Sequence, residues 1–176
     1  MKQAVKYLDQ INEYAGRFFA WSTSLMVLLI CCDVLMRYCF DFTLIWIIEL
    51  EIYFFAMSFL LASGYAFKYN KHVRVDVFYS QYSEKKKAWT DLIGGIFFLL
   101  PWALISCYVC FHYFRKSWFI QESSGQPGGL PALYILKFIL LLGFVLLLIQ
   151  AVSSILKSYM ILQGDSFDKV EHNSEN

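Results

Sequence analysis

Two of the five cysteines have the spacing of a reactive pair. Cys107 and Cys110 form a Cys-x-x-Cys motif, which is typical of dithiol redox centres and metal sites. Both lie in a long uncharged stretch, where small soft side chains pack between helices and need not react. Cys31 and Cys32 are adjacent and point in different directions, and only Cys39 falls near a loop. A membrane thiol oxidoreductase is therefore the weakest alternative, and loss of activity on replacing Cys107 and Cys110 would support it.

The histidines do not form a metal or haem site in the sequence. His72, His112 and His172 fall in three different parts of the chain, with no second ligand at a suitable spacing. A glycine-rich phosphate loop and a Ser-His-Asp arrangement are also missing from the pattern. We therefore predict a protein that is not an enzyme, with no catalytic residue, no metal ligand and no cofactor.

Charged residues inside apolar stretches are the stronger chemical signal. Such groups are costly in lipid and usually face a partner or a water-filled path. Asp33 and Arg37 are four residues apart, hence on one helical face, which predicts a structural ion pair. Glu49 could compete for Arg37 across the first loop. Two other roles stay open for these residues: a coupling-ion or substrate carboxylate, and contacts with another membrane subunit.

The composition sets the environment of these groups. Hydrophobic residues make up 59% of the 176 residues and aromatic residues 19%, with a mean hydropathy of +0.50. This balance is that of a membrane protein. Asp33 would cost about 2.5–3.5 kcal/mol at the centre of a span, whereas each Leu, Ile, Phe or Val returns about 0.3–0.6 kcal/mol. It lies near the end of its span, so the span survives.

The expected fold is an all-α membrane protein with four transmembrane helices. The apolar stretches are each close to the ~20 residues needed to cross the hydrocarbon core. They form a single domain, residues 1–163, and the polar residues 164–176 are expected to be a disordered tail. The predicted spans are about 18–38, 44–67, 92–114 and 134–159.

Basic residues predict the orientation. Eleven Lys and Arg residues fall on the side of the two termini and four on the other side. This bias predicts a multi-pass protein of the cytoplasmic membrane with both termini cytoplasmic. The net charge of +1 gives no case for nucleic-acid binding. Partners are expected in the membrane, including its lipid.

Two segments are expected to lie at the membrane surface. Near the N-terminus, apolar residues at helical spacing oppose Lys2, Lys6, Asp9 and Glu13, which predicts an amphipathic interfacial helix that runs into the first span. The apolar residues are Val5, Leu8, Ile11 and Ala15.

The second surface segment connects spans two and three and is rich in charge. If residues 73–82 are extended, Arg74 and Asp76 share a side and can pair. If they are helical, these two side chains diverge and Asp76 is free to meet a partner subunit. The basic residues of this segment agree with a cytoplasmic loop.

Further residues suggest how the helices bend, pack and stop. Pro101 removes one backbone hydrogen bond and should bend the third span. The second span carries a stripe of small residues that ends at Gly64 and suits close helix packing. Trp46, at the outer end of that span, is placed to anchor it at headgroup depth. The Pro- and Gly-rich stretch 116–131 predicts a compact turn before the fourth helix.

Several short motifs, taken in order, resemble one known family. They are Trp46-x-x-Glu49-Leu50, the small cluster ending at Gly64, His72-Val-Arg-Val-Asp76, Glu122-Ser123, Leu130-Pro131, Lys137 and the run from Gly143-Phe144 to Gln150. Their order across four spans is similar to the small membrane subunit, DctQ type, of tripartite ATP-independent periplasmic (TRAP) transporters. The family often has a Gly-Ala pair where this chain has Ala62-Ser-Gly64.

The resemblance implies the function and the partners. It implies a bacterial or archaeal secondary transporter in which a periplasmic substrate-binding protein captures an organic anion. A large membrane subunit then carries the anion inward with sodium, and the small subunit braces it. Substrate and sodium sites are implied in the large subunit, so the residues singled out here are candidates for the subunit interface or for structural ion pairs. These are Asp33, Arg37, Trp46, Glu49, Gly64, His72, Arg74, Asp76 and Lys137.

One alternative of another class remains at this stage. A small multidrug-type exporter would act alone as a homodimer and would place a carboxylate at mid-membrane depth. The acids of this chain lie nearer the outer interface, and transport by the chain alone would decide between the two.

Overall fold

A computed structural model describes residues 2–69, 79 and 81–164, and these residues form helices joined by loops, without a strand. Four helical stretches are long and apolar enough to cross a membrane: Lys2–Phe40, Ile45–Lys68, Glu84–Phe119 and Leu133–Leu162. The prediction of an all-α protein with four such helices is confirmed. The elements are α1 (Lys2–Phe40), α2 (Ile45–Ala56), the π-helix η1 (Met57–Leu61), α3 (Ser63–Lys68), α5 (Glu84–Gly94), the π-helix η2 (Gly95–Leu99), α6 (Leu100–Phe119) and α7 (Leu133–Leu162).

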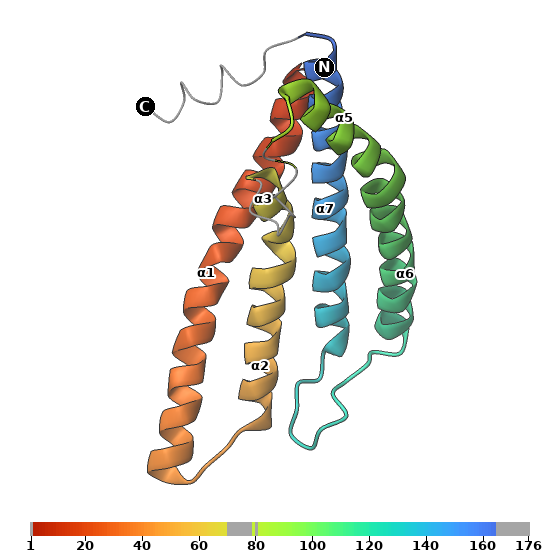
Figure 1. The fold of residues 1–176 in the computed structure, drawn as a ribbon. Coiled ribbons are helices and arrows are strands. Elements are labelled where there is room, and N and C mark those ends of the chain that lie inside the picture. The colour runs from red at the N-terminus through yellow and green to blue at the C-terminus, as the bar shows by residue number, and fades with distance from the viewer. Residues whose placement is uncertain (1, 70–78, 80, 165–176) are drawn as a thin grey trace.

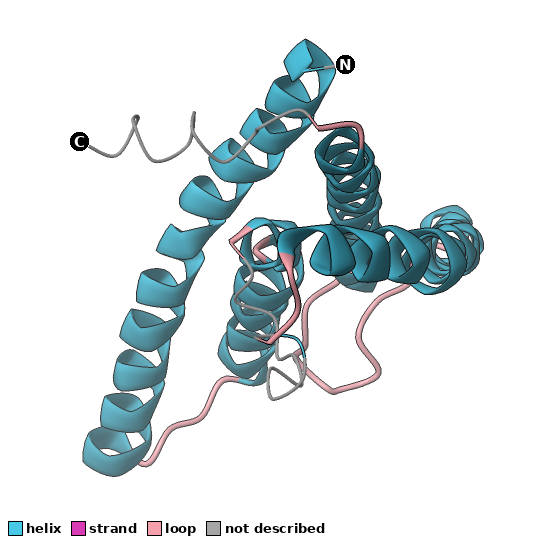
Figure 2. Cartoon of the chain, turned by 45° about the horizontal axis from the view of Figure 1, so that its top comes forward, coloured by secondary structure: helices cyan, strands magenta, loops and turns pink. Residues whose placement is uncertain are grey.

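α7 is the helix around which the others are arranged. It packs against α6, α5, α3 and α1, and it lies between α2 and α6 in Figure 1. α1 runs obliquely to the other helices, as Figure 2 shows. The small apolar core contains Leu61, Ile139 and Leu146, and Ile11 and Leu60 pack against it. The core therefore joins α1, η1 and α7, while much of the remaining apolar surface faces outward.

Glycines allow the closest helix contacts. A Cβ on Gly143 would lie 2.9 Å from the Cβ of Leu60 and 3.1 Å from its carbonyl oxygen. A Cβ on Gly64 would lie 2.3 Å from Oδ1 of Asn12 and 3.1 Å from the carbonyl oxygen of Leu146. Small residues permit this backbone approach where lipid offers no hydrophobic drive for association. At Gly64 the stripe of the second span therefore meets the chain's own α1 and α7.

Two of the spanning helices contain a π turn. The turn η2 ends two residues before Pro101, so the missing N–H of the proline falls next to a locally widened helix. Figure 1 shows the ribbon bending between α5 and α6, as expected from Pro101. The turn η1 was not expected, and it places the Leu60 backbone against Gly143.

The N-terminal segment differs from the expectation in which side it buries. It forms the first part of α1 and continues into the first span without a break, as predicted. However, Asp9, which was assigned to the solvent face, is buried together with Val5 and Asn12. The prediction for Asp9 was wrong because α7 supplies polar partners for its carboxylate. The periodicity of one segment does not reveal which helix packs against it.

Candidate functional site

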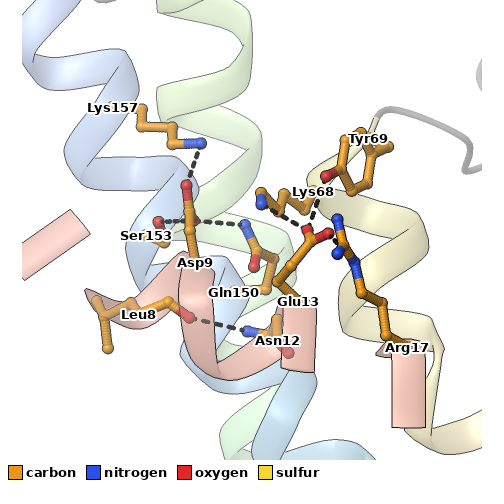
Figure 3. A network of polar contacts seen from close by, with 10 residues as sticks. All are labelled: Leu8, Asp9, Asn12, Glu13, Arg17, Lys68, Tyr69, Gln150, Ser153 and Lys157. Carbon is orange, nitrogen blue, oxygen red and sulfur yellow. Dashed lines mark hydrogen bonds and ion pairs between the residues drawn. The ribbon is translucent and has the colours of Figure 1, made fainter. Parts of the chain in front are cut away.

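Polar groups, most of them buried or half-buried side chains, gather in three places. The N-terminal cluster joins α1, α3 and α7 near the N-terminus and contains Asp9, Asn12, Glu13, Lys68, Gln150, Ser153 and Lys157 (Figure 3). The loop cluster lies at the opposite end of the helices and contains Glu49, Glu122, Ser124, Leu130 and Lys137. The acidic seam between α1 and α2 contains Asp33, Arg37 and Glu51.

Asp9 is the centre of the N-terminal cluster. Its Oδ1 accepts hydrogen bonds from the Ser153 hydroxyl at 2.5 Å and from Nε2 of Gln150 at 3.2 Å. Its Oδ2 lies 2.5 Å from Nζ of Lys157. The three partners are three and four residues apart in α7 and thus share one helical face. One carboxylate of α1 is therefore held by three side chains of α7, and Lys157 compensates its charge.

Glu13 ties α1 to the end of α3 in the same cluster. It accepts hydrogen bonds from Lys68 at 2.8 Å, Tyr69 at 2.7 Å and Arg17 at 2.8 Å. Burial, together with the hydrogen bond it donates to Glu13, raises the pKa of Tyr69. This arrangement makes the start of α1 part of the bundle.

Asn12 lies between these two carboxylates. It is fully buried, and its Nδ2 donates a long hydrogen bond of 3.5 Å to the carbonyl of Leu8. Its Oδ1 faces Gly64 and has no hydrogen-bond partner within the described part of the chain. Gly64 is thus the residue that makes room for the Asn12 amide.

In the loop cluster, Glu49 fixes the loop between α6 and α7. Its Oε2 accepts a 2.6 Å hydrogen bond from the backbone N–H of Leu130, and its Oε1 accepts one from the hydroxyl of Ser124. A Cβ on Gly129 would lie 2.7 Å from Oε1, so the glycine leaves space for the carboxylate. The expected competition of Glu49 for Arg37 is not what the structure shows. A carboxylate facing several loop donors is better satisfied by them.

Lys137 holds the other side of the same loop. Its side chain is 8% exposed, pairs with Glu122, and lies 3.8 Å from the ring centroid of Tyr113. The hydrogen bond from Lys137 lowers the pKa of Glu122. Tyr53 adds a 3.0 Å hydrogen bond from its hydroxyl to the carbonyl of Ala132. Glu122, Leu130 and Lys137, which belong to separate sequence motifs, are thus parts of one loop anchor.

The acidic seam contains the expected pair of Asp33 and Arg37. The guanidinium of Arg37 donates to Oδ2 of Asp33. Asp33 is almost completely buried, whereas the Arg37 side chain is half exposed. Glu51 of α2 interacts with the charges of both residues.

The remaining candidates are less informative. Trp46 is 41% exposed near the start of α2, and its role as an anchor stays a prediction. His72, Arg74 and Asp76 lie outside the described residues. Of the segment 73–82 only residues 79, 81 and 82 are described, so whether it is extended or helical stays open. All five cysteines are free thiols. The residues that the structure describes contain no group of three His, Cys, Asp or Glu side chains placed to hold a metal ion.

The sequence reasoning missed the N-terminal cluster and Glu51 of the seam. A usable signal was present in α7, where Gln150, Ser153 and Lys157 put polar groups on one face of an apolar helix. The partner residues in α1 gave no such signal, because they lie on the polar face of an amphipathic segment, where polar residues are expected.

One comparison with known proteins gave a match. A family model described as the DctQ component of tripartite ATP-independent periplasmic transporters matches residues 26–159. The matched range extends from the middle of α1 to near the end of α7 and includes the loop cluster and the acidic seam. Neither a curated protein nor a solved structure matches the chain.

Proposed function

The chain belongs to the DctQ family, the small membrane component of TRAP transporters, and from this premise we propose that it braces the large membrane subunit of a sodium-coupled transporter for an organic anion. In this role the chain contributes a fixed frame and leaves substrate and sodium to the large subunit. The periplasmic binding protein is a transient partner, and the large subunit is a stable one.

The observation that carries the proposal is that the buried polar groups connect separate elements of this chain. Asp9 and Glu13 tie α1 to α7 and α3, and Glu49 and Lys137 hold the loop between α6 and α7. These side chains join one element to another at the two ends of the helices. Such cross-links favour a rigid frame, which a moving transport subunit needs as its fixed reference.

The outward-facing apolar surface supports the same role. Exposed aromatic side chains occur on α1, η1 and α6, for example Phe18, Phe59 and Trp102. A wide apolar surface on tilted helices enlarges the membrane-embedded body and resists its sinking or tilting. It also offers area for a second membrane protein.

The proposal places the chain in the inner membrane of a bacterium or archaeon. The excess of Lys and Arg near the termini favours both termini in the cytoplasm. The N-terminal cluster would then lie at the cytoplasmic end and the loop cluster at the periplasmic end.

Reconstitution tests the proposal. The chain is incorporated into proteoliposomes alone, with the large subunit, or with the large subunit and the binding protein, and uptake of a radiolabelled organic anion is measured with and without a sodium gradient. We expect uptake only with all three proteins, and a stable complex of the two membrane subunits. Transport by the chain alone would favour the exporter alternative and contradict the proposal.

A further inference from the structure

The acidic seam lies at membrane depth between α1 and α2. Asp33 is seven residues before the last residue of α1, Phe40, and Glu51 is six residues after the first residue of α2, Ile45. At 1.5 Å per residue, both are roughly 9–11 Å inside the ends of their helices. The two carboxylates therefore sit at matching depth, below the level of the loop that joins the helices.

The charges of the seam do not balance within the chain. One guanidinium, that of Arg37, bonds to Oδ2 of Asp33, and the carboxylate of Glu51 lies within electrostatic range of both groups. Oδ1 of Asp33 and Oε1 of Glu51 are both buried and have no hydrogen-bond partner within the described part of the chain. A buried carboxylate oxygen without a donor is costly, and more so at membrane depth, where water is scarce.

The surface beside the seam is apolar and uncovered. Phe55 lies one turn after Glu51 on α2 and is 56% exposed, and Phe59 follows one turn later. Arg37 lies one turn after Asp33 on α1, with half of its side chain exposed. An apolar flank beside a seam with one uncompensated carboxylate fits a transmembrane helix that carries one basic residue.

We propose that a transmembrane helix of the large subunit packs on this flank and places a Lys or Arg side chain against the exposed part of Glu51. The inference rests on the proposed function, since it names the contact by which the large subunit is held. With the added cation the seam contains two carboxylates and two cations, so its charges balance. Glu51 is thus assigned as a residue of the subunit interface.

The test measures binding between the full-length chain and the large subunit in detergent, with Glu51→Gln and Glu51→Lys. Asp41→Asn is the matched control, because Asp41 is an exposed carboxylate in the neighbouring loop, and Asn tolerates its φ of 51°. We expect Glu51→Gln to weaken binding by about 30-fold or more, Glu51→Lys to weaken it further, and the control to bind like the wild type.

Two further measurements make the result specific. The thermal stability of the isolated chain should be unchanged or slightly raised by Glu51→Gln, because the partner cation is absent there. Replacement by Glu of one Lys or Arg in a transmembrane helix of the large subunit should restore binding of the Glu51→Lys chain.

Three results would overturn the inference. The Glu51→Gln chain could bind as tightly as the wild type, which would indicate a neutral or uninvolved carboxyl group. The isolated Glu51→Gln chain could lose enough stability to account for its weaker binding, or no basic position of the large subunit could rescue the Glu51→Lys chain. If wild-type binding is normal but Glu51→Gln has no effect, only this inference fails. If the wild-type chain does not bind the large subunit at all, the proposed function fails with it.

Discussion

Ser153 of α7 donates a 2.5 Å hydrogen bond to the carboxylate of Asp9 in α1, although the two residues are 144 positions apart in the chain. Gln150 and Lys157 bind the same carboxylate. Because three polar groups of α7 depend on one side chain, removal of that side chain affects all of them at once.

Asp9→Ala should therefore destabilise the protein by about 1–3 kcal/mol, because it leaves buried donors of α7 without an acceptor. The midpoint of thermal unfolding in detergent measures this. Gln10→Ala, at the exposed neighbouring position of the same helix, should leave the midpoint nearly unchanged. Equal midpoints for the two variants would show that the N-terminal cluster does not hold α1.

Gly143→Ala should cost about 1–3 kcal/mol, because the added methyl group meets the backbone of Leu60, which cannot move like a flexible side chain. Gly94→Ala is the matched control, since a Cβ there meets no atom within 4 Å. The control should be neutral or slightly stabilising, because Ala favours a helix over Gly. Guanidinium or heat denaturation in micelles compares the two, and a neutral Gly143→Ala would contradict the close packing of η1 on α7.

Glu49→Ala should release the loop between α6 and α7, because the N–H of Leu130 and the hydroxyl of Ser124 lose their acceptor. Limited proteolysis or amide exchange over residues 120–131 would report the change, with an expected increase in exchange of about tenfold. Gln126→Ala, which changes an exposed side chain of the same loop, serves as the control. Equal protection in both variants would remove Glu49 from the loop anchor.

The Glu122–Lys137 pair predicts a pH dependence. The pKa of Glu122 is lowered in the folded protein from its ordinary value of 4.5. A depressed pKa stabilises the fold above the unfolded-state value, and this stabilisation is lost as the pH falls through the folded-state value. The difference in thermal midpoint between wild type and Glu122→Gln should thus be constant from neutral pH to about pH 5.5 and shrink below 4.5. A difference that already shrinks above pH 6 would show that another group is responsible.

Much of the fold could be read from the sequence. The length of the apolar stretches and the free-energy cost of the charged residues in them predict four spanning helices. The pattern of prolines and glycines predicts the loop before α7. The Asp33–Arg37 contact follows from helical spacing alone. These features are local, so one segment contains the information for each of them.

The rest depends on contacts between distant segments. The burial of Asp9 needs the face of α7 that carries Ser153 and Lys157, and the role of Glu49 needs the path of a loop more than 70 residues later. The sequence shows Gly64 and Gly143 as small residues, but only the packed helices show that Asn12 and Leu60 occupy the space beside them. Likewise, only the packing of α2 beside α1 shows that Oε1 of Glu51 is buried without a hydrogen-bond donor in the described part of the chain.

The most direct test of the bracing role separates assembly from ion coupling. Arg37→Ala and Glu49→Gln are each introduced into the small subunit, and two quantities are measured in parallel: the yield of the complex with the large subunit, and the sodium concentration for half-maximal uptake per assembled complex. We expect the yield to fall by about tenfold, while the sodium dependence of the complexes that do form stays at the wild-type value. Normal assembly with an altered sodium dependence would contradict the account.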